Sequence, residues 1–389
     1  MDVQAIRAQI PGLAENVYLN TGGVGPSPQP VNDALLGTYA RYQEHGPDHP
    51  DTKAWVTEQV ALTRHRLARF LGVTESEIAL LRSVSEGIDV VAWGSQWRPG
   101  DEVIITDQEH PTGMLPWYNL RDRFGISVKQ VRLTDDRETL LDRVEHAITP
   151  QTKLLSFSHV TAENGLRLPA KEITKLAHAH GVEVLYDGAQ AVGQFPIDLY
   201  DMDVDYYCIT GHKWLLGGQG VGALYVRRDK LDDILVSWTG SSATEELNRA
   251  TGDHAWLEGA RRFEFGNRFW PSYVAFGEAV AFINDVGTGV IESQAGESAD
   301  TLKRKLAAIP GVTLLTPLDP DLSTGIVGFE IEGMTGTEIA RHFWERWQII
   351  CRPAFQGRAV RISCAFFTVP DELQTVLEGT RALASEAGS

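Results

Sequence analysis

The sequence predicts an α/β fold, with a mostly parallel sheet and crossover helices in a large domain, followed by a smaller α+β domain. Short β-rich runs alternate with helical patterns through the middle of the chain. Near residues 240–275 this alternation gives way to an irregular stretch rich in Trp, Arg and Gly. Strand and helix patterns mix after it. We therefore expect an N-terminal arm over residues 1–20 packed on the small domain, a large domain over 21–265 and a small domain over 266–389.

The strand-like runs of the large domain come in order as EVIITD from residue 102, KLLSFSHV from 153, VEVLYDG from 182, DYYCITG from 205 and GALYVRR from 222. A helix is expected in LPAKEITKLAHAHG, where Ile173, Leu176 and Ala177 form an apolar stripe and Gly181 is a stop signal. In the small domain we expect a helix around residues 274–286, strands in GVTLLTP and GIVGFEI, a helix over 335–347, a strand pair ending in VRIS, and a final helix.

Composition excludes several classes of protein. The 52 acidic and 35 basic residues give a net charge of −17, and no Lys/Arg cluster offsets it, which argues against nucleic-acid and anionic membrane partners. No run approaches about 18 apolar residues, so no membrane-spanning helix is expected. The start of the chain lacks the pattern of a signal peptide, and the three cysteines form no CxxC pair, so we expect a reducing, cytoplasmic location. DMDVD begins like a calcium loop, but Tyr206 and His212 occupy its glycine and glutamate positions, so no metal site is predicted.

Chemically useful side chains follow the predicted strands. In an open parallel sheet, ligands bind at the carboxyl ends of the strands. A carboxylate, several histidines and a lysine therefore converge on one rim. In chain order these strand ends carry Gln108, Glu109 and His110, then His159, then Asp187 with Gln190, and finally Thr210, His212 and Lys213.

Lys213 lies in GHKWLLGG, among small and aromatic residues that would desolvate it partly. Desolvation lowers the pKa of an amine and makes it available for a Schiff base, although a solvated surface lysine is the common alternative. Asp187 ends an apolar strand, and a buried carboxylate needs a cation, such as the protonated pyridine nitrogen of pyridoxal phosphate (PLP). The alternative for Asp187 is a turn or helix-cap residue in DGAQ.

A helix start in LRSVSEGIDVVAWG could hold a phosphate. Ser83, Ser85 and the free backbone N–H groups of the first turn are suitable donors. An ordinary capping box of Ser83 with Glu86 is the alternative. His110 could stack on an aromatic cofactor ring or be a plain loop residue.

Several motifs together resemble the class V aminotransferase family of fold-type I PLP enzymes: SVSEGID, TDQEHP, SHVTAENG, LYDGAQAVGQFPID and DYYCITGHKWLLGGQGVGALYV. Within this family the chain is most similar to cyst(e)ine C–S lyases, with isopenicillin N epimerase-like proteins and cysteine desulfurases further off. The likeness runs from PGLAENVYLNTGG to VRISCAFFTVPDEL, nearly the whole chain. It implies a seven-stranded sheet in a PLP-binding large domain and a homodimer with shared active sites.

The resemblance also implies individual roles. Lys213 would attach covalently to PLP and act as the catalytic base, Asp187 would pair with the pyridinium nitrogen, and His110 would stack on the ring. Gln190 would hydrogen-bond the phenolic oxygen of the cofactor. The phosphate would lie among the backbone of Val84, the side chains of Ser85, Thr210 and His212, and Asn267 of a second subunit.

The sequence departs from the desulfurase pattern in two places. Ala162 stands where desulfurases have an asparagine three residues after the strand-end histidine. The C-terminal loop that carries their nucleophilic cysteine has no thiol here, because Cys351 precedes Arg352 and Cys364 follows Arg361 inside or beside strands.

Arg352 and Arg361 have the spacing with which C–S lyase relatives bind substrate carboxylates. Arginine binds a carboxylate through two parallel hydrogen bonds, and such a clamp would orient the substrate. An interior-strand arginine paired with a structural acid is the alternative. Thr21 and Gly22 would line the same pocket from the N-terminal arm.

Our hypothesis is a PLP-dependent C–S β-lyase that acts on a small amino-acid substrate, cystine or a cysteine S-conjugate. Transaminase, epimerase and cysteine desulfurase activities share the cofactor and stay open. So does a decarboxylating or oxidatively deaminating enzyme that acts on a cysteine S-conjugate in a thiol or antibiotic pathway. A non-catalytic PLP-fold protein is the alternative from another class.

Overall fold

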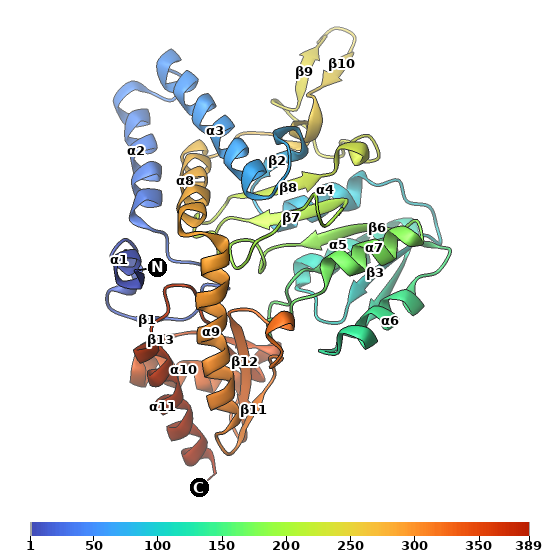
Figure 1. The fold of residues 1–389 in the computed structure, drawn as a ribbon. Coiled ribbons are helices and arrows are strands. Elements are labelled where there is room, and N and C mark those ends of the chain that lie inside the picture. Colours follow the sequence, from blue (N-terminus) through green and yellow to red (C-terminus); the bar gives the residue numbers. More distant parts are fainter. Residues whose placement is uncertain (1, 389) are drawn as a thin grey trace.

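The computed structural model describes residues 2–388, and its largest element is a seven-stranded sheet (Figure 1). β8 alone runs opposite to its neighbours, while the remaining strands share one direction. The predicted mostly parallel α/β fold is therefore confirmed. The strands are, in spatial order, β2 (Ile78–Leu81), β8 (Gly222–Val226), β7 (Tyr206–Thr210), β6 (Glu183–Asp187), β5 (Thr152–Ser158), β3 (Glu102–Thr106) and β4 (Ser127–Val131).

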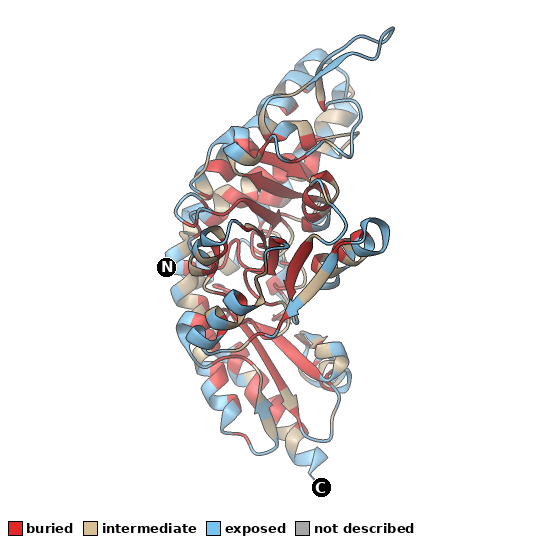
Figure 2. Ribbon diagram, turned by 90° about the vertical axis from the view of Figure 1, so that its right-hand side faces the viewer, coloured by how far each residue is buried: buried red, intermediate tan, exposed pale blue. Residues whose placement is uncertain are grey.

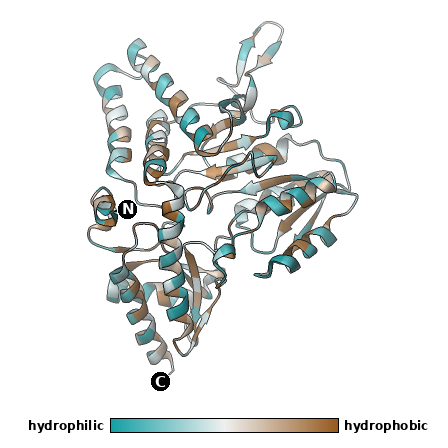
Figure 3. Cartoon of the chain, viewed as in Figure 1, coloured by the Kyte–Doolittle hydropathy of each residue, from teal (hydrophilic) through white to brown (hydrophobic). Residues whose placement is uncertain are grey.

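Helices cover both faces of this sheet, so its strands other than the edge strand β4 are largely buried on both sides. Val103 and Ile105 point into one apolar cluster and Ile104 points into the other, as the two-residue period of a strand requires. Figure 2 shows the strands as a buried interior, and Figure 3 shows them as mainly hydrophobic. The helices are α4 (Val84–Gly94), α5 (Pro111–Phe124), α6 (Arg137–Ala147) and α7 (Ala170–Ala179), together with α2 (Gln29–His45), α3 (Pro50–Phe70) and α8 (Trp270–Val286).

A second, four-stranded antiparallel sheet lies towards the C-terminus in the order β11-β12-β15-β14. Its strands are β11 (Val312–Leu314), β12 (Ile326–Ile331), β15 (Ala359–Ser363) and β14 (Arg352–Ala354), and it packs with α9 (Thr288–Ala307), α10 (Gly336–Trp347) and α11 (Pro370–Ala387). The helix expected over 335–347 is present, with Thr335 as its N-cap.

The N-terminal segment reaches this smaller sheet. β1 (Val17–Tyr18) pairs with β13 (Ile349–Ile350), and Arg7 in α1 (Val3–Arg7) hydrogen-bonds the Phe367 carbonyl and pairs with Glu372. Helix α8 packs mainly against α2 and α3, whereas α9 packs against β11 and α11. The predicted domain limits at residues 20/21 and 265/266 stay a prediction.

The irregular stretch expected near residues 240–275 contains an exposed hairpin. β9 (Thr244–Leu247) and β10 (His254–Trp256) pair antiparallel and project from the body of the molecule (Figure 2). No single helix in the described chain is long and apolar enough to cross a membrane. Helices α8 and α9, bent by 74° at their junction, pass that test only as a pair.

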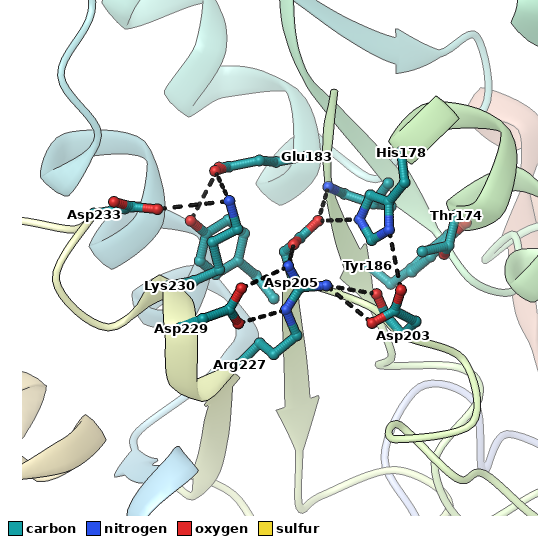
Figure 4. A network of polar contacts seen from close by, with 12 residues as sticks. Thr174, His178, Glu183, Tyr186, Asp203, Asp205, Arg227, Asp229, Lys230 and Asp233 are labelled. Carbon is teal, nitrogen blue, oxygen red and sulfur yellow. Dashed lines mark hydrogen bonds and ion pairs between the residues drawn. The ribbon is translucent and has the colours of Figure 1, made fainter. Parts of the chain in front are cut away.

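A buried ionic network holds the strand ends on the side of the sheet away from the carboxyl ends of the parallel strands (Figure 4). Asp205 is fully buried before β7 and accepts hydrogen bonds from the Val184 N–H (2.7 Å) and His178 Nε2 (2.9 Å). It also pairs with Arg227 (2.9 Å), which follows β8. The carboxylate of Asp205 therefore connects α7, β6, β7 and β8. These contacts hold the strands in place relative to one another, and so also their carboxyl ends at the other edge of the sheet.

Candidate active site

A cavity of about 1060 Å³ lies between the carboxyl ends of the parallel strands and the smaller sheet. Ten of the predicted site residues line it, from both sheets and from the loops between them. They are Val84, Ser85, His110, Asp187, Gln190, Thr210, His212, Lys213, Arg352 and Arg361.

Lys213 follows β7 in this cavity and is only partly exposed. The pKa of its ammonium group is lowered to about 8, mainly by desolvation and to a smaller extent by the charges of Arg361 and Arg352, while the charge of Asp187 acts in the opposite direction. A fully solvated surface lysine would have none of these shifts. The amine is thus prepared to react as a nucleophile or base near neutral pH.

Asp187 ends β6 with 7% of its surface exposed. Its carboxylate accepts one hydrogen bond, from the Ala189 N–H (2.8 Å), and forms no ion pair within residues 2–388. Burial raises its pKa, and Lys213 lowers it in part. Asp187 therefore makes the hydrogen bond expected of a turn residue, and its negative charge still has no cationic partner. The carboxylate is left available for a cation such as a protonated ring nitrogen.

The two histidines of the cavity are both held neutral. His110 caps α5, with Nδ1 accepting from the Thr112 N–H (3.2 Å). Its pKa is lowered first by burial and then by Lys213. Nδ1 of His212 shares a hydrogen bond with Thr210 Oγ1 (2.8 Å), and burial lowers its pKa to about 4. A neutral imidazole at position 110 is suited to packing on an aromatic ring.

The start of α4 opens onto the cavity. Ser83 is the N-cap and accepts from the Glu86 N–H (3.2 Å), but the Glu86 carboxylate accepts from the Arg82 N–H (2.6 Å), so the predicted capping box is only half formed. Ser85 is exposed, and its hydroxyl contacts Thr112 Oγ1 (3.2 Å). First-turn N–H groups lack helical partners, so this end can take an anion.

Arg361 is buried in β15 without an acidic partner. It is 2% exposed, donates from Nη1 to the Ala162 carbonyl (2.7 Å) and from Nη2 to Asn20 Oδ1 (3.2 Å), and leaves Nε unpaired. Burial lowers its pKa to about 9, and Arg352 adds to that effect. The alternative of a structural ion pair is therefore wrong for Arg361, and the guanidinium is free to bind a ligand carboxylate.

Arg352 lies directly opposite Arg361 on the neighbouring strand β14. It is exposed, and its side chain donates only a long hydrogen bond to the Pro353 carbonyl (3.4 Å). Like charges directly opposite in a sheet are destabilising, so an anionic ligand would relieve this pair.

Three predicted residues do not line this cavity: Thr21, Gly22 and Asn267. Thr21 is buried with its hydroxyl unpaired. The Gly22 N–H donates to Ser363 Oγ (3.2 Å), and the Gly22 carbonyl accepts from Gln190 Nε2 (2.8 Å). Gly22 therefore does not line the cavity itself but holds Gln190, which does.

The amide of Gln190 is largely occupied by the protein. Besides donating to Gly22, it accepts from Trp214 Nε1 (2.7 Å). The sequence could not show this, because both partners are distant along the chain. One N–H of Gln190 has no partner in these contacts.

Gly25 lies directly against the backbone next to Lys213. Its N–H donates to the His212 carbonyl (2.7 Å), and a Cβ at this position would collide with the Lys213 carbonyl.

Glu109 and Glu163 also line the cavity, and neither was assigned a role from the sequence. Glu109 is buried and accepts from Thr106 Oγ1 (2.7 Å) and from the N–H and hydroxyl of Ser158 (2.9 and 2.6 Å). Burial raises its pKa to about 7. Its position at the end of a strand, beside His110, was the only available signal.

No cysteine lines the cavity within the described part of the chain. Cys351 packs against the core of the smaller sheet, and burial raises the pKa of its thiol to about 12. Cys208 and Cys364 are fully buried. Each thiol is thus held protonated and away from a ligand.

A reactive lysine, an unpaired carboxylate and an anion-binding helix start at the carboxyl edge of this sheet define a PLP-dependent enzyme of fold type I. These residues fit the cofactor, because the ring nitrogen and phosphate each meet a group that the protein leaves unpaired. Residues 17–375 match the family Aminotransferase class-V, and the chain belongs to it. Its cofactor is pyridoxal 5′-phosphate.

Known relatives carry several activities. Isopenicillin N epimerase of Streptomyces clavuligerus is 32% identical over 384 residues, covering 95% of each chain. A cysteine desulfurase of Escherichia coli O127:H6 is 31% identical over 343 residues, covering 85% of this chain and 82% of the relative. The solved complex of the cystine C–S lyase C-DES with its reaction product cysteine persulfide has a TM-score of 0.89 at 30% identity, covering 96% of this chain and 99% of that chain.

Proposed function

We propose that the protein is a PLP-dependent C–S β-lyase that cleaves the Cβ–S bond of cystine or a cysteine S-conjugate. For cystine, one molecule and one water give pyruvate, ammonia and cysteine persulfide. The Cα proton and the Cβ–S bond are lost, and the sulfur leaves with the bonding electron pair. The observation that carries the proposal is a cavity with two arginines that lack acidic partners and no thiol.

PLP supplies an electron-withdrawing ring that stores the electron pair released from Cα. Lys213 would anchor the cofactor, and its free amine would remove the Cα proton, as its lowered pKa permits. Asp187 would keep the ring nitrogen protonated, and His110 would pack on the ring. The remaining N–H of Gln190 would reach the phenolic oxygen. The phosphate would be held by the Val84 N–H, Ser85, Thr210, His212 and, from a second subunit in a homodimer, Asn267.

Arg361 would bind the α-carboxylate of the substrate. It is buried and fixed by two hydrogen bonds, so little side-chain entropy is lost when a ligand binds. A carboxylate held there orients the Cα–H bond relative to Lys213. Arg352, an exposed residue that lines the cavity, would bind a second carboxylate. Thr21 and Gly22 would shape the site through the arm.

The cysteine positions favour a lyase over a desulfurase. A desulfurase needs a thiolate that can reach the substrate sulfur, and a thiol of raised pKa in an apolar core is a poor nucleophile. The thiol of Cys351 has a raised pKa and packs, partly buried, against the core of the smaller sheet, and unlike its neighbour Arg352 it does not line the cavity. The sulfur would therefore leave as a free persulfide.

A product assay tests the proposal. The PLP-loaded protein is incubated with L-cystine, and the products are separated by mass spectrometry and chiral chromatography. We expect pyruvate with cysteine persulfide. In a parallel incubation with L-cysteine, alanine with protein-bound persulfide would establish a desulfurase. With L-cystine, D-amino acid would establish an epimerase and a sulfur-containing keto acid a transaminase; each outcome would refute the lyase.

Two variants test the residue roles. Lys213→Ala should abolish turnover, with Lys171→Ala, an exposed lysine paired with Asp201, as the matched control. Asp187→Asn should retain some cofactor but lose most activity. Near-normal turnover in either site variant would contradict the assigned role.

A further inference from the structure

A second pair of charged side chains in the cavity has no partner. Glu163 lines the same cavity as Arg352, and its carboxylate forms no hydrogen bond or ion pair within residues 2–388. It is close enough to Arg361 to raise that residue's pKa. Arg358, another lining cation, is already paired with Glu330. Once Arg361 has bound an α-carboxylate, Arg352 and Glu163 are still without a partner of opposite charge.

The backbone beneath Glu163 is fixed by contacts from both sheets. The turn over residues 161–166 is closed by the Thr161 N–H donating to the Leu166 carbonyl (2.9 Å) and the Leu166 N–H donating to Thr161 Oγ1 (2.9 Å). Arg361 donates to the carbonyl of Ala162 (2.7 Å), next to Glu163. The carboxylate therefore projects from an ordered support, which reduces the entropy lost when it binds a ligand.

Ala162, at the position where desulfurases carry an asparagine, lines the cavity next to Glu163. An acid close to Arg361 could act in two ways. It could offset the charge of Arg361, which would affect all substrates alike, or it could bind a cationic group of the substrate. The free carboxylate and its place on the wall of the cavity favour the second role.

We propose that Glu163 and Arg352 form a second head-group subsite, which binds the ammonium and carboxylate of a distal amino acid. The inference rests on the proposed function and narrows its substrate class to cysteine disulfides whose leaving half is itself an α-amino acid. Arg352 donates hydrogen bonds to the distal carboxylate, and Glu163 accepts hydrogen bonds from the distal ammonium.

Three substrates separate these contacts. Cystine carries both distal groups. The mixed disulfide of cysteine with 3-mercaptopropionate carries only the distal carboxylate, and the mixed disulfide with cysteamine carries only the distal ammonium. Each can yield pyruvate from its cysteine half, so initial rates give a kcat/KM for each. The variants are Glu163→Gln and Arg352→Gln, with Arg358→Gln as the cavity-lining control.

We expect Glu163→Gln to lower, at least tenfold, the kcat/KM for the cysteamine disulfide relative to that for the mercaptopropionate disulfide. Arg352→Gln should shift this ratio in the opposite direction, and Arg358→Gln should leave it unchanged. An unchanged ratio in Glu163→Gln overturns the proposal, since it would mean that Glu163 acts only through Arg361.

A binding measurement separates failure of this proposal from failure of the proposed function. Calorimetric titration of PLP-loaded Lys213→Ala, with and without the added change Glu163→Gln, with the same three disulfides reports the subsite without turnover. If the wild type forms no pyruvate but the selectivity appears in the dissociation constants, the subsite stands and the lyase assignment falls. If pyruvate forms and neither measurement depends on Glu163, the subsite is refuted alone.

Discussion

The reactivity of Lys213 at neutral pH gives the sharpest prediction. Its pKa of about 8, against an ordinary value of 10.5, changes the fraction of free amine at pH 7. That fraction is about 9% for the lower pKa and about 0.03% for the ordinary one, a ratio of roughly 300. At pH 7 the apoenzyme should therefore present several hundred times more free amine to PLP than it would with an unperturbed lysine.

The assay is the rate at which apoenzyme takes up PLP, followed by absorbance from pH 6 to 10.5. We expect the rate to rise with pH and level off with a midpoint near 8. Removing the charge of Asp187 in Asp187→Asn should lower the midpoint, because this carboxylate raises the pKa of Lys213. Arg361→Gln should raise it for the opposite reason. The ionisations of PLP itself are common to all variants.

The control is Lys213→Ala, which should show no covalent uptake. A rate that continues to climb through pH 10 in the wild type would refute a desolvated Lys213. Midpoints that shift in the same direction in both charge variants would refute the assigned electrostatics.

Three further predictions concern single side chains. Arg361→Gln should lower kcat/KM for cystine by at least about 30-fold, mainly through KM, because a buried charged contact is worth about 2 kcal/mol or more; a loss below threefold would contradict α-carboxylate binding. Cys351→Ala should keep pyruvate formation within about twofold, whereas a desulfurase relay through this thiol would be abolished. The pKa of His178 is raised, first by its hydrogen bond to Asp205, so its contribution to stability is present below the ordinary value of about 6.5 and is lost as pH rises through the folded-state pKa. His178→Gln should therefore lower the Tm more at pH 6 than at pH 9, and an equal loss at both values would refute the linkage.

Much of the site could be predicted because it depends on strand ends. Asp187 and Lys213 follow buried apolar runs, and the carboxyl ends of parallel strands meet at one edge whatever the details of packing. The edge strand β4 and the helices α2 and α3 were not predicted, because exposed edge strands and weakly amphipathic helices leave little pattern in a sequence. The homodimer and the cytoplasmic location stay predictions.

Other features depend on register and on contacts between the two sheets. Cys351 and Arg352 are adjacent in sequence, yet Cys351 packs, partly buried, against the core of the smaller sheet, whereas Arg352 lines the cavity. If the cysteine faced the ligand, its thiol could react with the substrate sulfur; because the arginine faces it, the site can bind a carboxylate. Spacing alone does not give that choice.

The sequence by itself determined the α/β class, the family motifs and the position of Lys213 and Asp187 on one rim, since these follow from local periodicity and chain order. Only the tertiary structure decided that Arg361 lacks an acid, that Gln190 is bonded to Gly22 and Trp214, and that Glu163 lies unpaired in the cavity. The physical reason is that the hydrogen-bonding and desolvation of a polar side chain depend on residues distant along the chain, from 24 positions for Gln190 and Trp214 to 199 for Arg361 and Ala162, which only the packing of the chain brings together.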